Sequence, residues 1–396
     1  MKMKLDRKKA VPLYIQIREI IRSQIESGER KPMEPLPPED VLCREYNVSR
    51  ITIKKALEDL KKEGYIVRIK RKGTFVNFEN PKKEERGFRI GRKTIAFIVP
   101  DIEDAFISEI YKGIKDVAEE NGYSVAVFSS DKNIEKEIEN IELLKDSDME
   151  GAVIFPYWGR FNALQILKLK KKRFPFVLID RYFRDIETDT VIVDNFKGAY
   201  RVTKHLIDLG HTRIAHIMGV RCTANEDRFE GYRYALSKAS IHFNPSLVRE
   251  IQPFEGEGSL RFEPDDIGGY REAKSLLSCK ARPTAIFAGN DYIALGCYKA
   301  IKERGLRIPD DISIVGFDDL RFSSHLEVPL TTVRQPKYEI GKRACEILIM
   351  RITQKNPPTK FKKIVLPTEL IIRESCSCKR KQLEKNFYLG GEIWTK

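Results

Sequence analysis

The stretch PTAIFAGND at positions 283–291 decides the fold of most of this chain. Residues 284–288 have the composition of a short buried strand, the strand ends at Gly-Asn-Asp, and residues 292–303 continue with the apolar spacing of an amphipathic helix. The same order recurs, with strands expected at 94–100, 124–128, 151–155, 176–180, 213–218 and 312–317, and helices at 107–120, 196–209 and 229–238. Short apolar strands separated by helices indicate an α/β fold of doubly wound parallel sheets.

Residues 93–374 are more than one sheet of this kind requires, so the pattern predicts two lobes. In such folds a ligand binds in the crevice outside the carboxyl ends of the strands. A cleft of this kind serves an enzyme as well as a sensor, so periodicity alone does not choose between them.

Charge separates the first quarter of the chain from the rest. Positions 1–92 hold 24 Lys and Arg against 14 Asp and Glu, a net +10, whereas the remaining residues hold 48 against 44, a net +4. A small basic module beside a nearly neutral body predicts a polyanionic partner for the module alone, with nucleic acid as the leading candidate.

Other classes are excluded by what the sequence lacks. Apolar runs stop after five or six residues, and the N-terminus has no apolar stretch behind its positive charges, so we expect a cytoplasmic protein without a membrane span. The seven cysteines are scattered and odd in number, which favours free thiols, and the five histidines have no ligand spacing. We therefore expect no metal and no cofactor.

Residues 1–78 are predicted to form three helices and a hairpin. A helix begins after Pro12 and ends at Gly28, a short helix follows the proline-rich segment, and Ser49 is a candidate N-cap for a third helix at 50–63. Two strand-like runs, 65–69 and 74–76, flank the basic sequence KRKG. A helix with a basic, exposed N-terminal end beside a basic-tipped hairpin is the layout of a winged DNA-binding module. Residues 79–92, rich in Lys, Arg and Glu, are predicted to be a flexible charged linker.

This module resembles the GntR-type winged helix-turn-helix in PLYIQI (12–17), VSRITIKKAL (48–57), GYI (64–66) and GTFV (73–76). The resemblance implies DNA contacts from Ser49, Arg50, Thr52, Lys54, Lys72 and Gly73. Two positions depart from the family pattern. Asp40 stands where the family usually has a DNA-contacting arginine, and Arg71 stands where the wing usually has a glycine, so the operator sequence of other members does not transfer.

The remainder resembles the LacI/GalR effector domain in IVPD (98–101), VLIDR (177–181), GHTRIA (210–215), RFEGY (228–232), PTAIFAGND (283–291), IPDDISIVGFDD (308–319) and PLTTVRQP (329–336). That domain is similar to periplasmic sugar-binding proteins. The resemblance implies an effector-binding and dimerisation domain at 93–374, with a first lobe at about 93–193 and 335–356, a second at about 194–334 and 357–374, and a basic tail at 375–396. The combination of the two modules resembles the bacterial arabinose repressor family.

The resemblance implies that Arg228, Asn290 and Asp318 hold the hydroxyl groups of a ligand. Planar guanidinium, amide and carboxylate groups are the bidentate partners that a sugar requires. Alternatives remain open, because Arg228 also suits a surface ion pair, Asn290 a turn and Asp318 a loop cap. Further candidates, for which core packing or hinge contacts compete, are Phe106, Tyr157, Trp158, Asp180, Arg181 and Gln335. We expect His211, which follows a helix and Gly210, to be structural.

The resulting hypothesis is a homodimeric, sequence-specific transcriptional repressor that a small sugar releases from double-stranded operator DNA. L-arabinose is the first candidate, on the domain combination alone. The alternatives are another sugar, a purine or nucleoside as effector, a sugar-processing enzyme, and a transport-type binding protein. The sequence lacks a phosphate-binding glycine loop with lysine and a G-x-S-x-G nucleophile motif, which disfavours the enzyme. The winged module disfavours the transport protein.

Overall fold

The protein is described by a computed structural model. It describes residues 11–69, 73–77, 93–144, 147–157, 162–256, 259–261, 263–280, 282–354 and 360–378. The chain divides into two compact units, Met1–Arg92 and Lys93–Lys396. Lys72, Trp158, the expected linker at 79–92 and most of the expected tail lie outside the described residues. No helix in the described part of the chain is long and apolar enough to cross a membrane.

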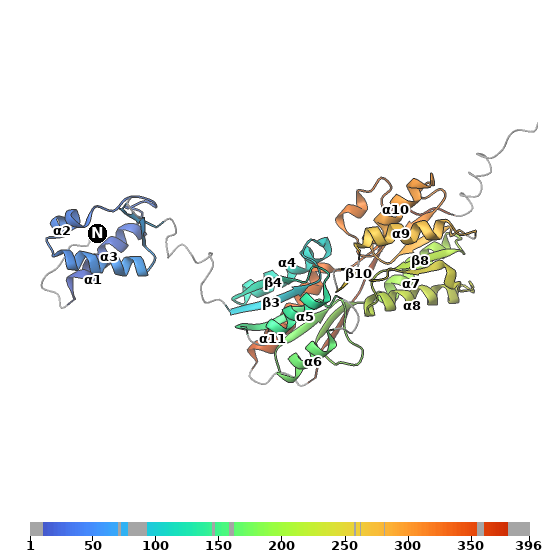
Figure 1. Ribbon diagram of the computed structural model, residues 1–396, viewed down its shortest axis with the longest axis horizontal. Helices are drawn as coiled ribbons and strands as arrows, with labels where there is room; N and C mark the ends of the chain where they lie inside the picture. The colour runs from blue at the N-terminus through green and yellow to red at the C-terminus, as the bar shows by residue number, and fades with distance from the viewer. Residues whose placement is uncertain are drawn as a thin grey trace, which may run out of the picture. The chain divides into compact units, whose positions relative to one another are not determined.

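The first unit has the predicted three helices followed by a hairpin (Figure 1). Its elements are α1 (Leu13–Glu26), α2 (Glu39–Tyr46), α3 (Arg50–Lys62), β1 (Ile66–Ile69) and β2 (Gly73–Val76). The strands pair antiparallel, from Ile66 opposite Val76 to Ile69 opposite Gly73. The apolar faces of the helices enclose one core that includes Ile21, Leu42 and Leu60, all fully buried. Propensity and pattern agree throughout this unit, which is why its elements were predictable.

The first lobe of the second unit is built on a six-stranded sheet of order β15-β7-β6-β5-β3-β4, with parallel pairing throughout. The strands are β3 (Lys93–Val99), β4 (Tyr123–Ser129), β5 (Met149–Ile154), β6 (Phe176–Ile179), β7 (Thr190–Val193) and β15 (Lys363–Leu366). Its helices are α4 (Ala105–Glu120), α5 (Ile134–Leu143), α6 (Ala163–Lys171) and α11 (Lys337–Thr353). Alternate residues of β3 face opposite layers. Phe97 lies in the core cluster with α4 and α11, and Ile98 in the cluster with α5 and α6.

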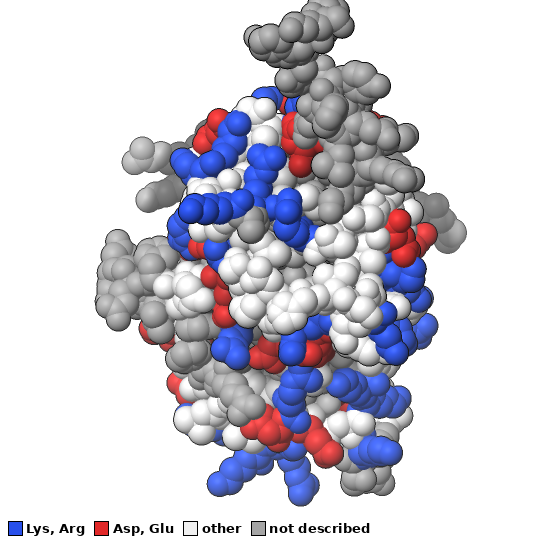
Figure 2. Space-filling model, turned by 90° about the vertical axis from the view of Figure 1, so that its right-hand side faces the viewer, with Lys and Arg blue, Asp and Glu red and all other residues white. Residues whose placement is uncertain are grey.

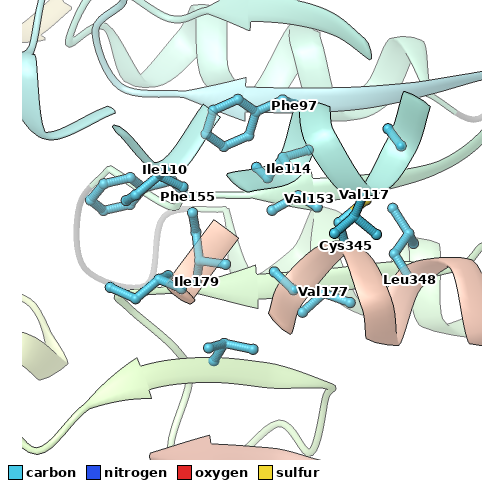
Figure 3. Packing of buried hydrophobic residues seen from close by; sticks show 14 of the residues in the cluster. Phe97, Ile110, Ile114, Val117, Val153, Phe155, Val177, Ile179, Cys345 and Leu348 are labelled. Atoms are coloured by element: carbon cyan, nitrogen blue, oxygen red, sulfur yellow. The ribbon is translucent and has the colours of Figure 1, made fainter. Parts of the chain in front are cut away.

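The layer formed by α4 and α11 is tightly packed (Figure 3). Phe97, Ile114 and Leu348 meet there from a strand and both helices. The two helix backbones approach closely because each carries a glycine at the contact. A β-carbon on Gly113 would lie 2.1 Å from the Tyr338 carbonyl oxygen, and one on Gly341 would lie 2.0 Å from that of Ile110. This layer supports the strands whose carboxyl ends form one wall of the cleft described below.

The second lobe has a four-stranded parallel sheet of order β13-β12-β8-β9. Its strands are β8 (Ile214–Met218), β9 (Val248–Glu250), β12 (Ala285–Ala288) and β13 (Ser313–Val315). Figure 1 shows α7 (Asn195–Asp208) and α8 (Thr223–Lys238) on one side of this sheet, and α9 (Asp265–Leu277) and α10 (Asp291–Glu303) on the other. The smaller elements are β10 (Phe254–Gly256), β11 (Ser259–Arg261), β14 (Thr332–Arg334), β16 (Glu369–Ile371) and the 3-10 helices Pro245–Leu247 and Arg321–Ser324.

Two expected boundaries differ from the structure. Residues 357–374 were assigned to the second lobe, but β15 pairs with β7 in the first sheet, Ile364 opposite Val191. The tail was expected to begin at position 375, but Ser375 is fully buried and its backbone accepts a hydrogen bond from Ile314 N. Both misassignments concern short strand-like segments, whose alternation does not specify the sheet that they join.

His211 is structural, as expected. Its side chain is fully buried, with Nδ1 3.0 Å from Thr284 Oγ1 and Nε2 3.1 Å from the Ser377 carbonyl oxygen. The ring thereby ties the C-terminal segment to the end of the second sheet.

Candidate functional site

The second unit contains a cavity of about 310 Å³ between its two lobes. First-lobe segments that follow β3, β5 and β6 form one wall, and second-lobe segments that follow β8, β12 and β13 form the other. The cavity therefore lies at the carboxyl ends of both sheets, where parallel α/β folds bind ligands. Every expected effector residue that the structure describes lines it, namely Phe106, Tyr157, Asp180, Arg181, Arg228, Asn290, Asp318 and Gln335.

Arg228 is buried and held on several sides. Its Nε donates to Asn195 Oδ1 over 2.8 Å, and its Nη1 donates to the Gly289 carbonyl oxygen over 2.7 Å. The guanidinium lies 3.8 Å from the centre of the Phe317 ring, and Nη2 lies 3.6 Å from Asp318 Oδ1. The alternative of a surface ion pair is therefore wrong. The fixed guanidinium presents an edge to the cavity in a single orientation.

Asp318 lies opposite this guanidinium on a loop with unusual backbone geometry. Its φ of 116° lies in the region that favours glycine, and Gln335 Nε2 donates to its Oδ1 over 2.6 Å. Burial raises the pKa of Asp318 well above its usual value, and the nearby Arg228 opposes that rise. Lys337 Nζ donates to the carbonyl oxygens of Asp318 and Asp319. A non-glycine residue held in this conformation requires such support from its surroundings.

Asp291, which the sequence analysis did not single out, anchors the loop from behind. Its carboxylate accepts hydrogen bonds from Leu320 N (2.8 Å), Ser323 Oγ (2.7 Å) and Thr332 Oγ1 (2.6 Å). Burial raises the pKa of Asp291 to about 6 despite these donors. Its position directly after Asn290 was the available signal, but three partners about 30 to 40 residues away become visible only in the fold.

Asn290 was considered either as a ligand-binding residue or as a turn residue, and its position is compatible with both. Its Oδ1 accepts a hydrogen bond from Ile293 N at the start of α10, as a cap does, while Nδ2 donates to Asp265 Oδ2 over 2.6 Å. The side chain lines the cavity at the same time. Its amide is therefore already oriented by the protein.

The first-lobe wall is aromatic. The Phe106 ring meets the Phe155 ring edge to face, with centroids 6.1 Å apart, and the Arg181 guanidinium lies 5.1 Å from the centre of the Phe155 ring. Arg181 also donates to the carbonyl oxygens of Pro156 and Tyr157. Asp180 precedes it with φ at 60°. The wall thus combines aromatic residues with the carboxylate of Asp180 beside them.

Carboxylates outnumber cations in this cavity. Its lining holds seven Asp and Glu residues, Asp101, Glu103, Asp104, Asp180, Asp265, Asp266 and Asp318, against Lys132, Arg181 and Arg228. Burial raises the pKa of Asp104 to about 6, helped by the negative charges of Asp265 and Asp101 and opposed by the hydrogen bond from Phe106 N. The sequence analysis missed the cluster at 101–104 and the pair at 265–266. In the part of the chain that is described, no group of three or more ligating side chains could hold a metal ion.

The lobes also touch beside the cavity. Tyr182 N donates to Thr223 Oγ1 over 3.1 Å, and Arg184 Nη2 lies 2.6 Å from Asp227 Oδ1. Ala105 N donates to Tyr292 Oη over 3.4 Å. These contacts join the first lobe to the helices that begin directly after β8 and β12.

The residues of the first unit that were expected to contact DNA, where they are described, lie at the N-terminal end of α3 and at the start of β2. Ser49 caps the helix by accepting a hydrogen bond from Thr52 N, and its hydroxyl lies 2.9 Å from that of Thr52. Arg50 and Lys54 are exposed, and the Ile51 side chain is 81% exposed. Gly73 begins β2 with φ at 118°, a conformation that disfavours other residues. Lys55 Nζ lies 4.0 Å from the centre of the Tyr14 ring.

Two acidic residues of α2 modify this surface. Glu39 Oε2 accepts from Arg50 Nε over 3.1 Å, and Asp40 pairs with Arg44 over 3.2 Å. Asp40 is the position at which the chain departs from the GntR pattern. Both acidic groups therefore hold an exposed arginine on the unit's surface, and DNA phosphates would compete for the same guanidinium groups.

Charge is distributed differently on the second unit. In Figure 2, which faces the second lobe, basic and acidic side chains both surround uncharged surface, and several Lys and Arg side chains adjoin one another at the upper left. The presence of both signs agrees with the nearly balanced count of the sequence beyond residue 92.

Comparison with known proteins gives two family matches. Residues 13–76 match the bacterial regulatory proteins of the gntR family, and residues 203–376 match the periplasmic binding protein-like domain. An arabinose metabolism transcriptional repressor of Geobacillus stearothermophilus is 33% identical over 93% of this chain and 99% of its own length. A ribose operon repressor of Haemophilus influenzae is 34% identical over 72% of this chain and 81% of its own length.

Solved structures agree with these matches. A LacI family transcriptional regulator from Enterococcus faecium, determined with bound ribose, superposes with a TM-score of 0.60 at 29% identity and covers 72% of this chain and 99% of its own. The relatives are transcriptional repressors and regulators rather than enzymes. The chain therefore belongs to the transcriptional repressors that join a GntR-type winged helix-turn-helix to a LacI-type, periplasmic-binding-protein-like domain.

Proposed function

We propose that this repressor binds an uncharged monosaccharide in the cleft between its lobes, that the sugar releases it from operator DNA, and that L-arabinose is the effector. The observation that carries the proposal is the buried set of Arg228, Asp318 and Gln335 beside an aromatic wall. Guanidinium, carboxylate and amide groups pair with adjacent hydroxyls, and aromatic rings cover the apolar face of a sugar. The arabinose repressor relative and the ribose-bound neighbour support the same class of ligand.

The size and charge of the cavity favour a neutral monosaccharide. A volume of about 310 Å³ lies at the low end of the range of roughly 300–1,000 Å³ for small-molecule sites, which suits one sugar ring better than a nucleoside. The excess of carboxylates repels phosphorylated sugars, sugar acids and nucleotides. A purine base remains the second candidate, because an amide and a carboxylate also pair with its ring edge, and an effector panel separates the two.

On the DNA side, two copies of the chain would place their α3 helices in successive major grooves of a near-palindromic operator. Arg50 and Lys54 would contact phosphates, Ser49 and Thr52 base edges or phosphates, and Lys72 and Gly73 the backbone next to the wing. The exposed Ile51 is suited to a thymine methyl group. A regulator of this kind would act on chromosomal DNA in the cytoplasm.

Coupling requires that the sugar bind the DNA-incompetent form better than the competent one. The polar contacts Tyr182–Thr223 and Arg184–Asp227 join the lobes beside the cavity, so ligand binding would change the balance between open and closed lobes. A coupling of about 1–3 kcal/mol would suffice for a regulatory response.

The proposal is tested by fluorescence anisotropy of the purified protein on labelled DNA from upstream of its own gene. L-arabinose is added first, with D-arabinose as the matched control, because the enantiomers differ only in hydroxyl geometry. D-ribose, disaccharides and purines follow. Release by L-arabinose alone supports the proposal in full. Release by another sugar corrects the effector, and tighter DNA binding with sugar reverses the proposed sign.

A further inference from the structure

Tyr157, which lines the cleft, has backbone groups held between two opposite charges. Its N–H donates to both carboxylate oxygens of Glu137, each over 3.1 Å. Its carbonyl oxygen accepts from the Arg181 guanidinium. A carboxylate at the N–H and a guanidinium at the C=O match the polarity of the residue's backbone groups, so both hydrogen bonds are charge-assisted.

Glu137 itself does not reach the cavity. It lies on α5 and is 2% exposed, and it also accepts from Asn162 Nδ2 over 2.6 Å. Asn162 precedes α6, so one carboxylate fastens the chain at the end of β5 and at the start of the next helix. This buried carboxylate accepts three hydrogen bonds within its own lobe and so fixes the positions of Tyr157 and Asn162, which an apolar core residue would not do.

We propose that Glu137 is a positioning residue of the effector site, whose negative charge holds Tyr157 and Arg181 in the arrangement that receives the sugar. This inference rests on the proposed effector binding in the same cleft. Loss of the charge leaves Tyr157 N–H with a weaker acceptor and removes the attraction that balances Arg181. The position of the Arg181 guanidinium over the Phe155 and Tyr157 rings is then less strongly stabilised.

The environment makes this charge sensitive to pH near neutrality. Burial raises the pKa of Glu137 to about 7, against the hydrogen bond from Tyr157 N, the charge of Arg181 and the hydrogen bond from Asn162. Among the described residues, Arg181 is the charged group that acts on it, and the neighbouring Lys136 on α5 is paired with Asp131 instead. Lower pH therefore protonates Glu137 and weakens the hold on Tyr157.

Glu137→Gln tests the charge with little change of shape. The Gln carbonyl can still accept from Tyr157 N. Its NH₂ group can donate to Asn162 Oδ1 once that amide turns over, because this oxygen has no hydrogen-bond partner among the described residues. The matched control is Glu139→Gln, an exposed glutamate on the same helix. Both are made in an Asp104→Asn background, because burial raises the pKa of the cleft residue Asp104 to about 6.

The first measurement is affinity for L-arabinose and D-ribose by calorimetry between pH 6 and pH 8. With Glu137 intact, affinity should fall about tenfold from pH 8 to pH 6, since a group with a pKa near 7 is only about one-tenth ionised at pH 6. Glu137→Gln should bind with close to the low-pH affinity and keep only the smaller pH dependence that comes from Asp291, whose pKa is also raised to about 6. Glu139→Gln should keep the full pH profile.

The second measurement needs no ligand. Hydrogen exchange at the Tyr157 amide should become about fivefold faster in Glu137→Gln, because a neutral acceptor replaces a charged one. Its melting temperature at pH 8 should nevertheless rise, since a buried charge is removed, whereas a residue needed only for the fold would lower it.

The outcomes separate the inference from the proposed function. If the unsubstituted protein binds neither sugar, the proposed function is overturned, and the positioning role with it. If the Asp104→Asn protein binds sugar, and its Glu137→Gln derivative matches its affinity profile and its Tyr157 exchange, only the inference is overturned. A Glu137→Gln chain that does not fold also overturns it, because the carboxylate would then be structural.

Discussion

Two arginines of this repressor, one in each unit, occupy opposite environments. The Arg50 side chain at the start of α3 is 79% exposed and has one polar partner among the described residues, Glu39. The Arg228 side chain in the cleft is 6% exposed and is fixed by Asn195, Gly289 and the Phe317 ring. An exposed, adaptable cation suits a polyanion that is recognised through many similar phosphates. A desolvated and preoriented guanidinium suits a small neutral ligand, for which geometry carries the selectivity.

The comparison is tested most strongly by Arg228→Lys. Lysine keeps the charge but cannot donate to Asn195 and Gly289 and still present a planar edge beside Asp318. We expect affinity for the sugar to fall at least about 100-fold, by loss of two charge-assisted hydrogen bonds, with operator affinity unchanged. Calorimetry and anisotropy measure the two affinities. Arg233→Lys, on the same helix but exposed, is the control. Retained sugar affinity in Arg228→Lys would remove the distinction between the two arginines.

The same substitution at Arg50 should have little effect. If Arg50 contacts phosphates, Arg50→Lys keeps most of the operator affinity, whereas Arg50→Ala loses about 1–3 kcal/mol of binding free energy. Anisotropy on specific and scrambled DNA measures both variants. A large loss of affinity for Arg50→Lys on specific DNA alone would instead indicate a bidentate contact of Arg50 to guanine. Both arginines would then depend on guanidinium geometry, and they would differ only in burial.

A third test concerns the repulsion between carboxylates that line the cleft, Asp104 and its neighbours Asp101 and Asp265. Asp104→Asn keeps the cap on Phe106 N and removes the repulsion from Asp101 and Asp265. The folded-state pKa of Asp104 is raised to about 6, so the folded state favours the protonated carboxyl. This group therefore contributes to the free energy of unfolding at low pH, and the contribution is lost as pH rises through 6. We expect Asp104→Asn to stabilise the second unit by about 1–2 kcal/mol at pH 8 and by almost nothing at pH 3.5. Thermal melts at the two pH values measure this. An equal shift at both would mean that charge is not the cause.

The smallest expected effect is in the salt dependence of DNA binding. Lys54→Ala should reduce the slope of log K against log salt by about 0.9, as expected for one lost phosphate contact. The matched control is Lys62→Ala, at the opposite end of α3, which should leave the slope of the unsubstituted protein unchanged. Equal slopes for all three proteins would place the DNA contacts elsewhere on the first unit.

Local pattern predicted much of this molecule because burial and capping are local properties. The apolar run before Gly289 forms β12, and Ser49 caps α3 as its position suggested. The cleft residues followed from resemblance and from their places at strand ends, and those that are described do line one cavity. Glu137, Asp291 and Asn195 were missed, because their hydrogen-bond partners lie about 20 to 40 residues away along the chain.

The sequence by itself determined the winged module, the strand and helix order and the concentration of basic charge in the first unit, because each follows from periodicity, turn chemistry or composition within a short window. Tertiary structure alone decided which sheet received β15, and it gathered seven carboxylates around one cavity. It also determined that Glu137 and Arg181 hold Tyr157 from its two sides. Parallel strands joined by crossover helices bring distant residues to one edge, so charges that are unremarkable along the chain acquire their effect only when folding removes water from between them.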